Sequence, residues 1–136
     1  MKLKLWIAPA VAIVALVASA GSAWMQDSEA VVRAQASNDA RDGSDVIRVD
    51  VLVEGVRNLG AFQFVLSYDG DKVAIVDNGI ERGPFLETSG REVFCTEPTI
   101  DTNAVRYECV TLGSDPAEGA TGDGALVSMY FQQKAD

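Results

Sequence analysis

The 136-residue chain divides into three segments that differ in how hydrophobic and polar positions follow one another. Residues 5–25 contain no charged side chain, residues 26–45 are mostly small, polar and acidic, and residues 46–132 contain short runs in which apolar side chains recur at every second position. A period of two is typical of β-strands that bury one face, because successive side chains of a strand point to opposite sides. The third segment is therefore predicted to be all-β.

The clearest alternation lies in residues 61–68, with the sequence AFQFVLSY. Its bulky side chains, which we expect to point into a core, are Phe62, Phe64, Leu66 and Tyr68. The side chains between them, which we expect on the outer face, are Ala61, Gln63, Val65 and Ser67. A slip of one residue would expose all four bulky side chains, so this strand fixes its own register.

Further short β-type runs follow one another, separated by Gly, Pro, Asn and Asp. The predicted strands are residues 46–53, 61–68, 73–76, 92–96, 105–112 and 125–132. Short strands between recurring turn signals favour an antiparallel β-sandwich or a barrel. The glycine-rich residues 113–124 are predicted to be a loop, and Tyr107 and Tyr130 are the aromatic residues that could lie on a surface.

The last predicted strand, residues 125–132, is apolar on both faces, which is typical of a central strand. Only residues 133–136 follow it. A central strand needs a neighbour on each side, because an open edge leaves backbone groups unpaired. Either an earlier strand covers that edge, or the chain lacks its final strand or strands.

The N-terminal segment has the pattern of a bacterial export signal over residues 1–23. Lys2 and Lys4 precede the apolar run, and residues 18–20 (Ala-Ser-Ala) match the cleavage pattern of small residues. The alternative is an uncleaved anchor, since about 20 apolar residues suffice to span a bilayer. Either reading places the rest of the chain outside the cytoplasm. Residues 24–45 are predicted to be a flexible acidic leader, and residues 46–136 the folded domain.

The charge and composition exclude several classes of function. The net charge is −9, and removal of Lys2 and Lys4 would make it −11, so a phosphate backbone would be repelled and nucleic acid is not an expected partner. The chain has no histidine, which excludes histidine-based catalytic and metal sites. No nucleotide-binding motif occurs, and the Asp-Gly stretches lack calcium-loop spacing and are predicted to be turns. We therefore expect no cofactor, no metal and no enzymatic activity.

Cys95 and Cys109 are the only cysteines. They lie in two predicted strands that an antiparallel hairpin would place side by side, and an even count in an exported chain favours a disulfide. A metal or redox pair is the alternative, but neither a histidine nor a C-x-x-C spacing supports it. We predict a Cys95–Cys109 disulfide.

The order of these motifs resembles the cohesin domain and the wider group of carbohydrate-binding-like β-sandwiches. The resemblance rests on the Gly-x-Phe-x-Phe-x-Leu-x-Tyr-Asp strand of residues 60–69, on Gly-Pro-Phe-Leu at 83–86, and on the final strand that begins at Gly124. It covers residues 46–132 and implies a jelly-roll, antiparallel β-sandwich without catalytic activity. The chain departs from the family in its cysteine pair, in its single domain and in an apparent lack of closing strands.

The resemblance implies a partner and a face for it. Cohesins bind dockerin modules through the sheet whose outer face here carries Ala61, Gln63 and Val65, so these residues are the predicted partner-binding set. A solvent-facing sheet surface is the alternative for the same residues. Carbohydrate binding, in a polysaccharide-degrading system, is the second hypothesis, and an orphan sandwich without a binding role is the third.

Overall fold

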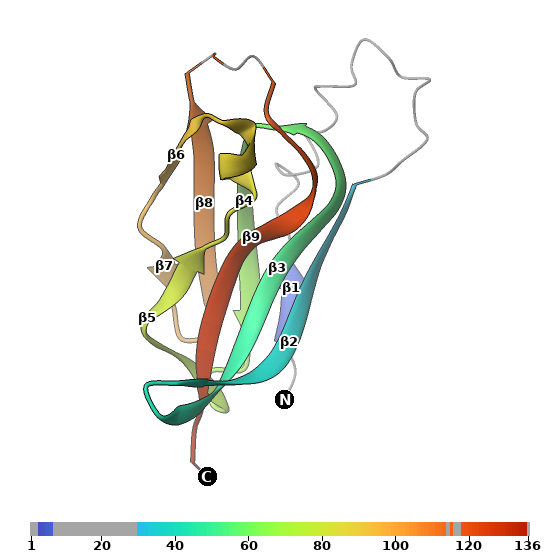
Figure 1. Cartoon of the computed structure of the whole chain (residues 1–136). Helices are drawn as coiled ribbons and strands as arrows, with labels where there is room; N and C mark the ends of the chain where they lie inside the picture. The colour runs from blue at the N-terminus through green and yellow to red at the C-terminus, as the bar shows by residue number, and fades with distance from the viewer. Residues whose placement is uncertain (1–2, 7–29, 114, 116–117, 136) are drawn as a thin grey trace.

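The computed structural model describes residues 3–6, 30–113, 115 and 118–135, and within them the chain forms two antiparallel sheets packed face to face (Figure 1). The β4–β8 sheet has the order β1-β4-β8-β6, with β7 also paired to β8. Its strands are β1 (Leu3–Trp6), β4 (Ala61–Tyr68), β6 (Glu92–Cys95), β7 (Thr99–Ile100) and β8 (Ala104–Leu112). The predicted antiparallel β-sandwich is confirmed.

The β3–β9 sheet has the order β2-β3-β9-β5. Its strands are β2 (Val31–Arg41), β3 (Ser44–Leu59), β5 (Val73–Arg82) and β9 (Ala120–Gln133). A single 3-10 turn, η1 (Leu86–Ser89), lies between β5 and β6 in the described part of the chain. Strand β9 has β3 on one side and β5 on the other, so an earlier strand covers the edge that the sequence left open. The prediction that closing strands are missing stays a prediction.

The alternating side chains of β4 form one wall of the core, as the sequence predicted. All four bulky side chains are buried, and the four between them are partly exposed. They pack against valines of β3 and against Met129 and Phe131 of β9. The rings of Tyr68 and Phe131, from opposite sheets, meet edge to face with centroids 5.0 Å apart. The two sheets therefore share one continuous apolar interior.

The segment predicted to be a flexible leader contains a strand, so that prediction is wrong for residues 31–41. Strand β2 pairs with β3 through a two-residue turn at Asp42 and Gly43, both of which have positive φ. Asp-Gly is favoured in such hairpin turns because these residues tolerate positive φ. Val32 and Ala34 pack against the core. Composition gave the wrong prediction for this segment because the neighbouring strand β3 supplies the hydrogen bonds that stabilise a polar sequence.

Three strands are longer than predicted, because turn-forming residues lie inside them rather than at their ends. β3 continues to Leu59 through Gly55 and Asn58, both with positive φ, and its pairing with β9 shifts register there. β5 likewise continues through Asn78, and β9 begins within the predicted glycine loop. Such register shifts are β-bulges, which bend a strand without ending it.

The two tyrosines considered for the surface are both buried. Tyr107 faces the core, where its ring centroid lies 6.3 Å from those of Phe62 and Phe64. Tyr130 lies on the outer face of the β3–β9 sheet, where the guanidinium carbons of Arg41 and Arg48 stand 4.3 Å and 5.9 Å from its ring centre. Arginines over an aromatic face make favourable cation–π contacts and cover the ring.

The buried tyrosines predict a loss of stability at alkaline pH. Desolvation raises the pKa of Tyr68 above its ordinary value of 10.0, with Asp101 adding to the shift, and desolvation raises the pKa of Tyr107 in the same direction. Both groups ionise more readily in the unfolded chain, so the free energy of unfolding should fall as the pH rises above about 10. Urea unfolding at a series of pH values tests this. In the Tyr68→Phe/Tyr107→Phe variant the free energy of unfolding should fall less with rising pH. An equal fall in the variant and the unmodified chain would contradict the prediction.

The predicted signal, anchor and cleavage region lies mostly in residues 1–2 and 7–29, outside the described residues. Of that region the structure describes Leu3–Trp6, whose backbone pairs with β4. No helix in the described part of the chain is long and apolar enough to cross a membrane.

Candidate docking face

The outer face of the β4–β8 sheet is built by alternation along three adjacent strands. Strand β8 buries Val105, Tyr107, Cys109 and Thr111 and turns the residues between them outwards. The outward side chains of the face are Ala61, Gln63 and Val65 on β4, Arg106, Glu108, Val110 and Leu112 on β8, and Phe94 on β6. The face therefore combines positions from segments that lie far apart in sequence.

Three large apolar side chains lie together at one end of this face. Phe94 is 53% exposed, Val110 39% and Leu112 43%. Val110 lies directly opposite Phe94 in the pairing of β6 with β8, and Leu112 is two positions further along β8. We call these three residues the Phe94 patch. Single exposed apolar residues are ordinary, but neighbouring ones that form a continuous patch are typical of interaction sites.

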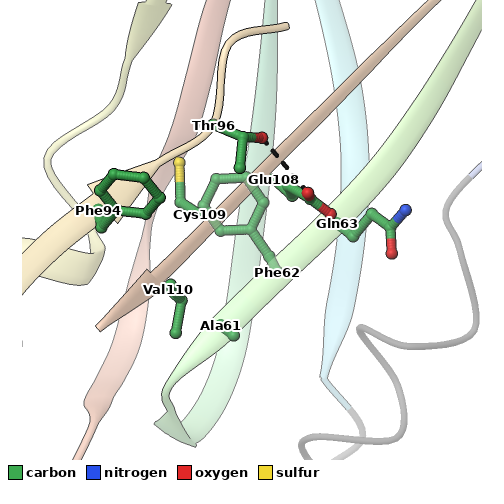
Figure 2. A pocket seen from close by; sticks show the side chains of 8 residues that line it. All are labelled: Ala61, Phe62, Gln63, Phe94, Thr96, Glu108, Cys109 and Val110. Carbon is green, nitrogen blue, oxygen red and sulfur yellow. Dashed lines mark hydrogen bonds between the residues drawn. The ribbon is translucent and has the colours of Figure 1, made fainter. Parts of the chain in front are cut away.

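A shallow hollow of about 310 Å³ lies beside the Phe94 patch (Figure 2). Its lining residues are Ala61, Phe62, Gln63, Phe94, Thr96, Glu108, Cys109 and Val110. The apolar and polar members lie on different sides, as Figure 2 shows: Phe94, Val110 and Ala61 at one side, and Thr96, Glu108 and Gln63 at the other. Thr96 Oγ1 donates a hydrogen bond to Glu108 Oε1 over 3.4 Å.

Three polar side chains, Gln63, Glu108 and Arg106, are neighbours on the outer face, and the first two line the hollow. Gln63 lies opposite Glu108 in the pairing of β4 with β8, and Arg106 is diagonal to it. With its amide oxygen turned towards Arg106, Gln63 accepts hydrogen bonds from the guanidinium Nε (2.6 Å) and Nη2. These three side chains therefore present one cation, one anion and an amide, and their charges balance.

The disulfide joins the two strands that carry the Phe94 patch. Cys95 and Cys109 are directly opposite in the pairing of β6 with β8 and are bonded, which confirms the prediction. Strand β6 has only four residues and lies at the edge of the sheet. The bond therefore fixes the position of Phe94 and Thr96, the two neighbours of Cys95 that line the hollow.

The three predicted partner-binding residues lie on this outer face, and their role in binding stays a prediction. Ala61 and Gln63 line the hollow, whereas Val65 lies further along β4, beside Arg106. The three residues of the Phe94 patch were not among the predicted partner-binding residues. Two of them could have been found from the alternation of residues 105–112. In that strand, Val110 and Leu112 continue the outward row that begins with Arg106 and Glu108.

The described residues offer few other chemical sites. No group of three or more His, Cys, Asp or Glu side chains able to hold a metal occurs among them. Phe94 is the one strongly exposed aromatic ring between residues 30 and 135, excepting the undescribed positions 114, 116 and 117.

A comparison with solved structures finds a similar fold. A chain in the crystal structure of a type II cohesin–X–dockerin complex from Acetivibrio cellulolyticus, an N-terminal interface mutant, superposes with a TM-score of 0.63. The fold is a cohesin-like β-sandwich. The match covers 77% of this chain and 71% of the other, and at 14% identity the likeness concerns the fold alone. No family model matches the chain, and no curated protein matches it.

Proposed function

We propose that this chain is an exported, non-catalytic, cohesin-like interaction module that docks a dockerin-type or other extracellular protein. The proposed contact surface is the outer face of the β4–β8 sheet. The observation that carries the proposal is the Phe94 patch, three exposed apolar side chains held in register by β6, β8 and their disulfide. The fold shared with a cohesin–dockerin structure supports the same kind of partner.

The make-up of the face favours a protein partner. Protein interfaces usually combine apolar side chains with polar ones beside them, and here the Phe94 patch, at one end of the face, has Glu108 and Gln63 across the hollow from Phe94. The Cys95–Cys109 disulfide also supports export, since such bonds persist in oxidising compartments.

The docking proposal predicts which substitutions weaken binding. Phe94→Asp and Val110→Asp each place a charge in the Phe94 patch, and we expect each to weaken partner binding at least tenfold, since apolar side chains that anchor an interface carry about 2 kcal/mol or more. Val31→Asp is the matched control, because Val31 is 47% exposed but belongs to β2 of the other sheet. Partners captured from dockerin-bearing secretomes would be identified by mass spectrometry and measured by calorimetry.

Two results would count against the proposal. One is that no protein is found that binds the unmodified chain but not the Phe94→Asp variant. The other is that Val31→Asp weakens partner binding as much as Phe94→Asp does.

Carbohydrate binding remains the second candidate because Phe94 could stack on a sugar ring, but a single exposed ring supports it weakly. Retardation of the chain in polysaccharide affinity gels, abolished by Phe94→Ala, would favour it over protein docking.

A further inference from the structure

Strand β4 is paired with β1 only along residues 65–68, and without β1 it would be an edge strand that lacks the features protecting the other sheet edges. Edge β2 carries Arg33 and Arg41, edge β5 carries Glu81 and Arg82 and a register shift, and edge β6 has four residues and begins with Glu92. Strand β4 has eight residues without a charge or a proline, and its pairings contain no bulge. An uncharged, regular, apolar edge is a template for another strand.

The backbone groups that face this edge can be assigned. Tyr68 donates its N–H to the carbonyl of Asn103 on the β8 side, and the carbonyl of Gly60 accepts from Thr111 on the same side. Neighbouring residues of a strand direct their backbone groups to opposite sides. The donors and acceptors on the outer edge are therefore those of Ala61, Gln63, Val65 and Ser67.

In the structure, a short strand of the same chain pairs with part of this edge. Leu3–Trp6, from the predicted export signal, pairs antiparallel with residues 65–68 of β4. Leu3 lies opposite Tyr68 and Leu5 opposite Leu66, two residues whose side chains belong to the core. Residues 61–64 have no pairing from β1.

A strand of the other sheet, β2, lies opposite the space beside β4. Arg82 of β5 donates to the carbonyl of Val93 in β6, so β5 and β6 mark the same side of the sandwich. Counted from that side, β8 faces β9, β4 faces β3, and the position of β1 faces β2, an arrangement that Figure 1 also shows. Val32 and Ala34 of β2 pack against the core. A second copy placed edge to edge on β4 would bring its own β3 into the space of β2, so a single strand fits better than a second domain.

We propose that the outer edge of β4 is a strand-acceptor site, which binds an extended segment of a partner protein once export has removed Leu3–Trp6. The proposal rests on the export included in the proposed function and, in addition, on removal of the predicted signal, residues 1–23. The segment would add a strand to the sheet, with main-chain hydrogen bonds for affinity and alternate side chains for specificity. It would carry bulky apolar residues at alternate positions, as the sequence Leu-Lys-Leu-Trp does, and no acidic ones, because the domain is itself acidic.

The test uses the exported chain purified from the periplasm, with its N-terminus read by mass spectrometry. The probe is a synthetic peptide of residues 2–8, KLKLWIA, with blocked ends. We expect saturable binding with one peptide per chain and slower hydrogen exchange at the amides of Ala61, Gln63, Val65 and Ser67.

A proline at Ser67 provides the sharper variant. Ser67→Pro removes one edge donor while leaving the hydrogen bonds to β8, because proline is tolerated where the N–H faces away from the sheet. We expect it to weaken peptide binding at least tenfold, whereas Ser67→Ala, which keeps the donor, should bind as the unmodified chain does. If Ser67→Pro does not fold, the exchange pattern of the unmodified chain decides.

Several outcomes would overturn the proposal: an exported chain that keeps Leu3–Trp6 on β4, peptide binding that leaves the four amides unprotected, or a dimer that Ser67→Pro dissociates. Phe94→Asp should leave peptide binding unchanged. Failure of strand acceptance is thereby distinguished from failure of the docking face.

Discussion

Replacing Phe64 with alanine should lower the free energy of unfolding by about 3–5 kcal/mol. The side chain is 1% exposed and lies in the middle of the inward row of β4. Its ring stands 6.1 Å from that of Phe62 and 6.3 Å from that of Tyr107, centroid to centroid. Truncation removes the apolar contacts and leaves a cavity between two sheets that cannot close around it, because their strands are fixed by hydrogen bonds.

The chain contains its own control for this prediction. Phe94→Ala deletes the same atoms from a side chain that is 53% exposed, and we expect its effect on stability to be within about 1 kcal/mol. Urea unfolding followed by circular dichroism gives both values. Similar losses for the two variants would show that Phe64 is not part of a packed core and would contradict the sandwich described above.

Removing the disulfide should lower the free energy of unfolding by about 3 kcal/mol. Cys95 and Cys109 are 14 residues apart, so the bond closes a loop that the unfolded chain would otherwise leave free. It also holds β6, a four-residue edge strand, against β8. For a domain of this size, such a loss is a large share of the total stability.

The measurement compares unfolding with and without reductant. The Cys95→Ala/Cys109→Ala variant should be less stable than the oxidised chain and should no longer respond to the reductant. The same variant should dock its partner more weakly than Thr96→Ala does, because β6 positions Phe94. Equal stability of the oxidised and reduced chains would show that the pairing of β6 with β8 does not need the bond.

The sequence predicted the parts of the fold in which neighbouring residues carry the information. The alternation of residues 61–68 gave both the strand and its inward face, and the two cysteine-bearing strands were correctly expected to pair. Sequence pattern did not predict the strand of residues 31–41, most of which are polar or small. Their strand exists because Asp42 and Gly43 turn the chain back onto β3, and pairing with β3 stabilises a segment that its own composition does not.

The outer face of the β4–β8 sheet, the candidate docking face, could be described from the sequence only in part, for a similar reason. Ala61 and Gln63 could be placed on an outer face from their own strand, and both line the hollow. Phe94 and Val110 could not be joined to them, because their proximity depends on the register of β6 with β8 and of β8 with β4.

By itself, the sequence determined that alternating apolar residues would bury one face of several short strands, that the surface would be acidic, and that no histidine-based chemistry was available. Only the tertiary structure decided which strands are neighbours, and therefore that three apolar side chains from two strands form one exposed patch and that Leu3–Trp6 pairs with β4. The physical reason is that alternation is a property of neighbouring residues, whereas strand pairing depends on hydrogen bonds and packing between segments far apart in sequence.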